Sequence, residues 1–285
     1  VICTHTFENC VNFNQPVDLG SAKNCAYMFE YCNSFNQPIK IPDNCENAYW
    51  MLYGCNNFDS NITIGNDINN LAYGLQNLYK FNSKLILGNN INNMYYAFAY
   101  WTNFNQPIKI PDNCRDAAYA FEYCYNLNSP ITIGNNVGNV YYAFYGCSNF
   151  NAPVTIGNNV GNCYDMFKFS AMYGSGYSFD NIFNSPVTIG SDINDISFLL
   201  NSRAAFNSKV IIGNNINNCA YFFNYCTNFN NTVILGDNYN NCAYMFSCCF
   251  NFNQPIHIPT NIKNFDGMFQ NCQVFNQPIN IPDDA

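Results

Sequence analysis

The sequence predicts an α/β solenoid of about twelve 23-residue coils, each with one short parallel strand and one short helix. Three observations predict this fold. An aromatic residue or Leu followed by Asn or Asp recurs about every 23 residues. Within the repeat, apolar residues first alternate, as in a half-buried strand, and then recur with helical spacing. All twelve prolines fall at one of two places in the repeat. Such strict periodicity is typical of a solenoid, whose coils pack mainly on their neighbours.

The anchor residue, numbered position 1, sets the register of the repeat. Neighbouring anchors are 23 residues apart except for a first interval of 22 and one interval of 33 between Phe150 and Phe183. The long interval predicts a ten-residue insertion within residues 168–182, in a single solenoid that covers residues 1–285. Both ends fall inside a repeat and carry no polar cap, so we expect further coils or domains of the same protein at both ends. The anchors are Phe13, Phe35, Phe58, Phe81, Phe104, Leu127, Phe150, Phe183, Phe206, Phe229, Phe252 and Phe275.

Positions 5 to 7 of each coil predict the parallel strand. Positions 5 and 7 carry Val, Ile or Leu, as at Ile131 and Ile133, while position 6 varies freely. This period of two in β-branched residues favours a short half-buried strand. A Pro at position 4 can begin such a strand, and the Gly or Pro at position 8 ends it.

Positions 11 to 21 predict the short helix. Ile91, Met94, Phe98 and Trp101 follow the spacing of one apolar helical face. Position 13 is Asn or Asp, as at Asn93, which suits a helix N-cap. A helix of about two turns would be marginal alone, so stacking between coils must stabilise it. The Asn at position 2 predicts a ladder of hydrogen bonds between equivalent residues of successive coils.

The repeat resembles the BspA-like, or Treponema pallidum-type, leucine-rich repeats. One copy runs from Ala120 to Leu127 as AFEYCYNL, and another runs from Met268 to Phe275 as MFQNCQVF. The resemblance implies a right-handed leucine-rich-repeat superhelix. It also implies a surface or secreted protein of bacteria, eukaryotic microbes or phages, with a role in adhesion or host recognition and no catalytic residues to carry over. The repeat departs from the pattern at the insertion and at Leu78, Trp101 and Arg203, where position 21 lacks Cys.

Composition argues against several classes of function. A net charge of −8 leaves little basic surface to neutralise a nucleic-acid backbone. No apolar run is long enough for a membrane span. The two histidines, His5 and His257, lie far apart, and the carboxylates are scattered, so we expect no enzyme, no catalytic residues and no cofactor.

The sixteen cysteines fall mostly at positions 11, 14 and 21, where apolar residues also occur. We therefore interpret them as buried free thiols, with Cys248 alone off the core face. Disulfides between stacked cysteines are a weaker alternative, because parallel Cβ vectors give poor bridge geometry. A metal site is not expected, because neither a Cys-x-x-Cys motif nor a Cys/His cluster is present.

Three surfaces are candidate ligand sites. The first is the strand face around Lys84, Ile86, Lys209 and Ile211, which could equally be a plain solvated face. The second is an aromatic column at position 16, which the helical geometry turns away from the core and which could instead merely pack coil on coil. The third is the insertion with Tyr173, Tyr177 and Phe179, whose composition suits a recognition loop but also a tolerated surface insertion. The column comprises Tyr27, Trp50, Tyr73, Tyr96, Tyr119, Tyr142, Tyr221 and Tyr244.

These features together predict a non-catalytic recognition or adhesion module on a bacterial cell surface or a phage virion. We expect it to be extracellular and to bind a protein or a glycan. The alternative is a purely structural spacer or fibre segment that displays other domains.

Overall fold

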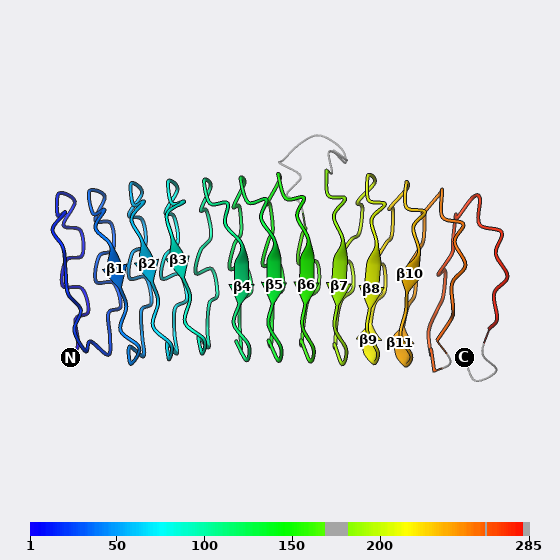
Figure 1. Cartoon of the computed structure of the whole chain (residues 1–285), viewed down its shortest axis with the longest axis horizontal. Helices are drawn as coiled ribbons and strands as arrows, with labels where there is room; N and C mark the ends of the chain where they lie inside the picture. Colours follow the sequence, from blue (N-terminus) through cyan, green and yellow to red (C-terminus); the bar gives the residue numbers. More distant parts are fainter. Residues whose placement is uncertain (169–181, 260, 282–285) are drawn as a thin grey trace. The chain divides into compact units, whose positions relative to one another are not determined.

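A computed structural model describes residues 1–168, 182–259 and 261–281 (Figure 1). The chain forms two compact units. Unit 1 comprises Val1–Gln106, Ile110–Leu127 and Val137–Asn149, and unit 2 comprises Pro107–Lys109, Asn128–Asn136 and Phe150–Ala285. Each unit is a parallel β-solenoid.

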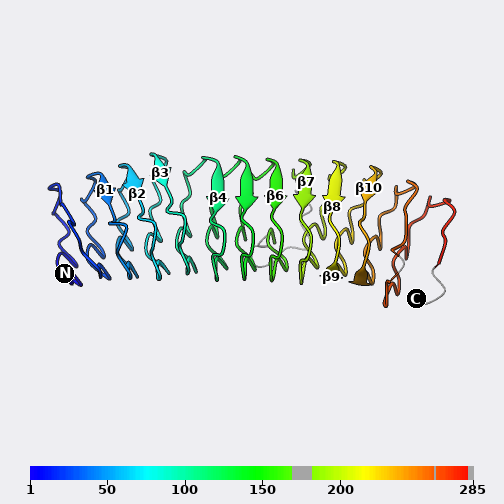
Figure 2. The same cartoon turned by 60° about the horizontal axis from the view of Figure 1, so that its bottom comes forward.

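Strands at positions 5 to 7 lie where the sequence predicts them in nine coils, whereas residues 17–19, 256–258 and 279–281 form none. In unit 1, β1 (Ile39–Lys40), β2 (Ile62–Thr63) and β3 (Leu85–Ile86) pair in parallel, with Ile39 opposite Ile62 and Ile62 opposite Leu85 (Figure 1). A second parallel sheet has the order β10-β8-β7-β6-β5-β4 (Figure 2). Its strands are β4 (Ile108–Ile110), β5 (Ile131–Ile133), β6 (Val154–Ile156), β7 (Val187–Ile189), β8 (Val210–Ile212) and β10 (Val233–Ile234).

The prediction of a helix in each coil is wrong. The part of the chain that the structure describes contains no helix, so the fold is a parallel β-solenoid and not an α/β leucine-rich-repeat superhelix. The residues at positions 16 and 20 have a left-handed backbone, with φ of 54° at Tyr96 and 64° at Tyr100. An α-helix needs φ near −60° at every residue, so two left-handed residues four apart exclude it.

Successive β-turns replace the helix, and every second amide bonds to the next coil. Met28 N–H donates to the Cys25 carbonyl of its own coil (3.2 Å), whereas Phe29 N–H donates to the Met51 carbonyl of the next coil (2.8 Å). Glu30 and Tyr31 repeat this alternation two residues later. The inter-coil bonds offset the cost of left-handed residues, because they satisfy amides that would otherwise be buried without partners.

Positions 11 to 13 form a second parallel row instead of the start of a helix. In unit 2, β9 (Ile216–Asn218) pairs with β11 (Tyr239–Asn241), and in unit 1 single bridges join Asn24, Asn47 and Asn70. The expected cap bond is present without its helix. Asn47 Oδ1 accepts a hydrogen bond from the backbone N–H of Tyr49 (3.1 Å), which begins the first turn.

Rings at positions 1 and 18 fill the core between the two rows. In unit 1 the ring of Phe81 lies 6.2 Å from that of Phe58 and 6.0 Å from that of Phe104. In unit 2 the rings of Phe229 and Phe252 lie 5.7 Å apart. Since each ring packs on the ring of the next coil, the core continues within each unit without a break at the coil boundary.

The predicted ladder at position 2 is confirmed. Asn36 N–H donates to Asn14 Oδ1 (2.9 Å), and Asp59 N–H donates to Asn36 Oδ1 (2.8 Å). In unit 2, Asn207 N–H likewise donates to Asn184 Oδ1 (2.7 Å). The short polar side chain therefore sets the register between coils, as its recurrence in the sequence indicates.

Position 21 supplies a buried hydrogen-bond donor, which the sequence analysis did not foresee. The thiol of Cys55 donates to the Phe29 carbonyl of the preceding coil (3.0 Å). Trp101 replaces Cys and donates through Nε1 to the Leu75 carbonyl (2.6 Å), and Arg203 donates to the Phe167 carbonyl. Two of the three departures from Cys therefore keep a donor to the same backbone carbonyl, and only Leu78 has none.

Cysteine burial follows the repeat, with one correction. All sixteen cysteines are free thiols, and all are buried except Cys3, Cys10 and Cys272. Cys248, which we expected off the core face, is only 6% exposed. The reason is its size and its neighbours: Ser247 Oγ and Asn271 Nδ2 donate to its sulfur (3.7 and 3.6 Å), whereas the larger Tyr31 and Tyr225 at the same position remain exposed.

Native alkylation should follow this burial. With iodoacetamide at pH 8 and a reductant present, Cys10 should react first, followed by Cys3. Burial raises the pKa of Cys32 to about 11 and that of Cys226 to about 12, so few thiolates form there. Mass spectrometry of digested samples measures the modification at each site, and urea-unfolded protein provides full labelling as the control. Rapid labelling of Cys226 in the native protein would contradict this expectation.

Candidate functional site

The aromatic column at position 16 is continuous in unit 1. The rings of Tyr73 and Tyr96 are stacked at 5.3 Å, and those of Tyr96 and Tyr119 at 4.6 Å with an interplanar angle of 8°. Trp50 packs edge-on against Tyr73 at 6.0 Å, and Tyr142 packs edge-on against Tyr119 at 5.4 Å. All of these rings, and that of Tyr27, are half-buried. The left-handed backbone at position 16, not a helical face, turns them outward.

Tyrosines at position 15 border this column in alternate coils. Tyr49, Tyr95 and Tyr141 lie edge-on to column rings, as in the contact of 5.5 Å between Tyr73 and Tyr95. The intervening coils carry Ala72 and Ala118, which are buried. Large and small residues thus alternate from coil to coil and let each phenol fit between its neighbours.

A second aromatic row lies at position 20. Tyr100 and Tyr123 pack at 5.1 Å with a tilt of 37°, and Tyr31 is 41% exposed. At position 19, Tyr53 and Tyr145 connect the two rows. Tyr53 lies 4.5 Å from Trp50 of its own coil and 5.4 Å from Tyr31 of the preceding coil. We call the rows at positions 15, 16, 19 and 20 of unit 1 the tyrosine surface.

Two buried carboxylates lie at position 19 of the same surface. Glu30 is 6% exposed and Glu122 is 7% exposed. Desolvation raises the pKa of Glu122 to about 7 and, together with the negative charge of Glu8, also raises that of Glu30. The carboxylate of Glu122 in turn adds to the effect of burial in raising the pKa of Tyr100 to about 12. The sequence does not predict that these carboxylates are buried, because position 19 carries Tyr, Gln or Ala in other coils.

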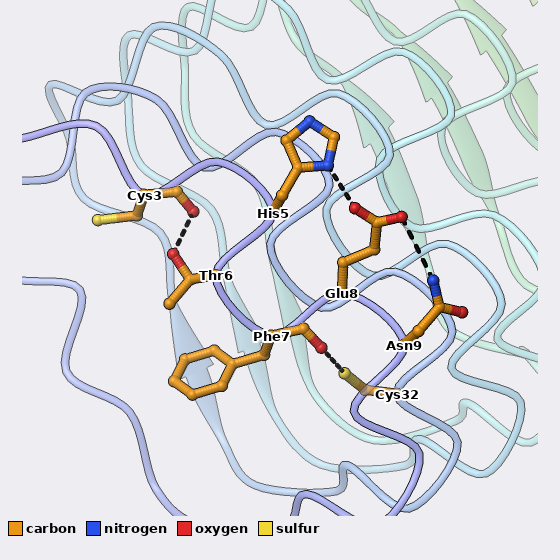
Figure 3. Close-up of polar contacts among 7 residues, drawn as sticks. All are labelled: Cys3, His5, Thr6, Phe7, Glu8, Asn9 and Cys32. Atoms are coloured by element: carbon orange, nitrogen blue, oxygen red, sulfur yellow. Dashed lines mark hydrogen bonds and ion pairs between the residues drawn. The ribbon is translucent and has the colours of Figure 1, made fainter.

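A polar cluster borders the first ring of the column (Figure 3). His5 Nδ1 and Glu8 Oε2 are 2.5 Å apart, and the imidazole of His5 stacks on Tyr27 at 4.5 Å. Asn9 donates to the other oxygen of Glu8 (3.3 Å), and the thiol of Cys32 donates to the Phe7 carbonyl (2.8 Å). His5 therefore extends the column by one ring.

Unit 2 repeats the column in shorter form. The ring of Tyr221 stacks on Phe198 at 4.7 Å and on Tyr244 at 5.0 Å. Asp165 occupies position 16 in place of an aromatic residue, and the buried Arg203 lies close enough for its charge to interact with it. Burial lowers the pKa of Arg203 to about 9, although the negative charge of Asp165 opposes this shift.

The strand-face candidates occupy two separate places. In unit 1, Lys84 and Ile86 are exposed, and Ile86 is paired with Thr63. In unit 2, Lys209 is exposed and Ile211 is half-buried beside Thr188. Each place shows a few scattered apolar and basic groups without a convergent arrangement. The insertion residues Tyr173, Tyr177 and Phe179 lie outside the described residues.

The described residues contain neither a metal-binding cluster nor a membrane-spanning helix. Among residues 1–168, 182–259 and 261–281, no group of three His, Cys, Asp or Glu residues could hold a metal ion. Within the same ranges, no helix is long and apolar enough to cross a membrane. The tyrosine surface is the candidate whose side chains the structure packs into a continuous set.

Comparison with known proteins shows a match to one family model. A family model described as "Mycoplasma protein of unknown function, DUF285" matches residues 2–86, 69–185 and 194–283. The first two matches overlap, as expected for a model built on a repeat. No curated protein and no solved structure matches the chain.

Proposed function

We propose a function from the site for this chain, which belongs to the DUF285 family of Mycoplasma proteins of unknown function. The chain is a non-catalytic recognition module on a cell or virion surface, and it binds a protein through the tyrosine surface. The observation that carries the proposal is the unbroken column of half-buried aromatic rings from Tyr27 to Tyr142, five tyrosines and Trp50. Tyrosine gives a large contact area with little loss of side-chain entropy, and it is enriched where binding energy concentrates.

The packing of the rings favours a protein over a glycan. A sugar stacks on an open ring face, but Tyr96 and Tyr119 already cover each other's faces at 4.6 Å. The surface therefore offers ring edges and phenol hydroxyls held in fixed places. A phenol is protonated at neutral pH, and burial raises the pKa of Tyr73 further, to about 12, so its hydroxyl stays a hydrogen-bond donor. Fixed donors beside apolar edges suit the side chains of a folded protein.

The resemblance of the repeat to BspA-like proteins also supports a role in adhesion. The alternative is a spacer, in which the rings serve only to pack one coil on the next. The half-burial of the column agrees with either role, so the two must be separated by binding to cells.

A variant that removes rings without disturbing the turns tests this proposal. Tyr100→Asn with Tyr123→Asn places Asn at position 20, where Asn77 already adopts a φ of 68°. We expect saturable binding of the labelled chain to intact cells, measured by flow cytometry, to weaken at least tenfold. Prior protease treatment of the cells should abolish it, whereas glycosidase treatment should not.

The matched control is Tyr225→Asn, which makes the same change at position 20 of unit 2. Tyr225 is 45% exposed and has a φ of 59°, so the backbone should tolerate Asn equally well. Binding should stay within twofold of that of the unaltered chain. No saturable binding to any cell in a broad panel, or equal binding by the double variant, would leave the spacer role as the better account.

A further inference from the structure

Glu122 is a buried carboxylate without a partner. It is 7% exposed, and desolvation is the one cause that perturbs its carboxyl group. Among the described residues, none donates a hydrogen bond to it or forms an ion pair with it. Burying a carboxylate is costly unless it takes up a proton or a cation or several donors compensate, so a cation bound beside Glu122 would lower that cost.

The repeat places this carboxylate between two pairs of tyrosines. A side chain at position 19 packs against position 16 of its own coil and position 20 of the preceding coil. Tyr145 shows this, with ring distances of 5.4 Å to Tyr142 and 5.3 Å to Tyr123. At the corresponding positions beside Glu122 stand Tyr119 and Tyr100. Backbone hydrogen bonds join Glu122 to both: its N–H donates to the Tyr119 carbonyl (3.1 Å), and Tyr100 N–H donates to the Glu122 carbonyl (2.7 Å).

Each of these two neighbours has a second ring packed against it. Tyr96 stacks on Tyr119 at 4.6 Å, and Tyr123 packs on Tyr100 at 5.1 Å. The carboxylate charge acts on both Tyr96 and Tyr100, and in each case it is the largest contribution after burial. Glu122 therefore lies among rings from both the position-16 and the position-20 rows.

The coil before Glu122 carries a small residue at position 19. Its residue at position 19 is Ala99, where other coils carry Tyr53 or Gln76. Ala99 contributes neither a ring nor a polar group. The carboxylate charge acts on the phenols of Tyr96, Tyr100 and Tyr125, and among the described residues no basic side chain perturbs the carboxyl group.

This set of groups selects one class of cation. Calcium and magnesium require several oxygen ligands, whereas Glu122 supplies a single carboxylate. An organic ammonium group pairs with a carboxylate and is also attracted to aromatic rings, and this attraction grows when water is excluded. We propose that Glu122 and the tyrosines around it bind an organic ammonium group, from either a lysine side chain or a choline headgroup. The inference extends the proposed recognition role, but its test uses small molecules and does not depend on binding to cells.

Titration of the whole chain with choline, followed by NMR at constant ionic strength, tests the site. Choline should shift the signals of the aromatic rings in a saturable way, and Glu122→Gln should weaken this binding at least tenfold. Gln76 occupies the same position in another coil, so Gln should be accommodated there. The neutral isostere 3,3-dimethylbutanol should not bind measurably.

Glu30→Gln is the matched control. Glu30 is buried to the same extent at the same position, but the preceding coil places His5 and Asn9 at positions 16 and 20 instead of tyrosines. Choline affinity should stay within twofold of that of the unaltered chain. Tyr100→Asn should weaken binding by about threefold to tenfold, in keeping with the loss of one cation–π partner.

Two further probes identify the source of the ammonium group. A capped Gly-Lys-Gly peptide represents a protein lysine, and phosphatidylcholine vesicles represent a lipid surface. Binding of one of them that Glu122→Gln weakens assigns the source. If Glu122→Gln binds choline as well as the unaltered chain does, if the neutral isostere binds equally, or if the unaltered chain binds none of the probes, the proposal is overturned.

Discussion

Replacing Phe81 with Ala should lower the free energy of unfolding by about 3–5 kcal/mol, which is the usual cost of removing a fully buried Phe. Phe81 is 0% exposed, and its ring lies 4.3 Å from that of Trp101. It also lies 6.2 Å from the ring of Phe58 and 6.0 Å from that of Phe104. A cavity here interrupts the ring stack on both sides, because each ring is the packing partner of the next.

Urea unfolding followed by tryptophan fluorescence measures this loss. The chain has two tryptophans, Trp50 and Trp101, and both lie in unit 1 with Phe81. The control is Ile86→Ala in the same coil, which removes a side chain that is 42% exposed and should cost less than about 0.5 kcal/mol. A loss below about 1 kcal/mol for Phe81→Ala would show that the rings do not form a close-packed core.

Replacing Glu122 with Gln should remove a large part of the pH dependence of stability. The pKa of Glu122 is about 7 in the folded chain and has an ordinary value of 4.5. The folded state therefore holds the proton more tightly than the unfolded state does. Stability falls as pH rises from about 4.5 to about 7 and is constant above that range for this group. At about 1.4 kcal/mol per pH unit, the loss is about 3 kcal/mol.

Urea midpoints at pH 5 and pH 8 check this expectation. The unaltered chain should lose stability between the two values, and Glu122→Gln should lose about 2.5 kcal/mol less, because the unfolded state is already mostly ionised at pH 5. Some decline should persist in the variant, because the pKa of Glu30 is raised as well. Glu30→Gln should remove a smaller part of the decline. An identical decline in the unaltered chain and in Glu122→Gln would contradict the buried, unpaired state of Glu122.

The local sequence predicts the strands and the ladder because both depend on short-range chemistry. Val187 and Ile189 alternate with Thr188, and Pro186 and Gly190 flank them. This pattern predicts a short half-buried strand. The Asn at position 2 is likewise limited to bonds near its own backbone, so its repetition predicts an inter-coil bond. Both features appear in the structure at the predicted residues.

The helix prediction is wrong because inward-facing residues can recur every three or four positions in more than one backbone. Ile91, Met94, Phe98 and Trp101 are all buried, as a helical face requires. A run of β-turns buries the same residues and also sends every second amide to the next coil. Tyr96, a residue that disfavours a left-handed backbone, adopts one because those inter-coil bonds outweigh the local strain.

The candidate site was predicted in part. The column at position 16 was expected to point outward, and it does, through turn geometry instead of a helix. The buried carboxylate of Glu122 was not expected, because its environment consists of rings contributed by two coils about 23 residues apart. The donor role of position 21 was also missed, although Trp101 and Arg203 share with Cys the ability to donate a hydrogen bond.

The sequence by itself determined the length of the coil, most of the residues that face the core and the place of most strands at positions 5 to 7, because these follow from the periodicity of apolar and turn-forming residues. Only the tertiary structure decided the backbone between positions 14 and 21 and the surroundings of Glu122. The physical reason is that both depend on bonds and contacts between coils. An amide that finds its partner in the next coil no longer needs one four residues earlier, and a carboxylate acquires its environment from rings that the chain brings together only when the coils stack.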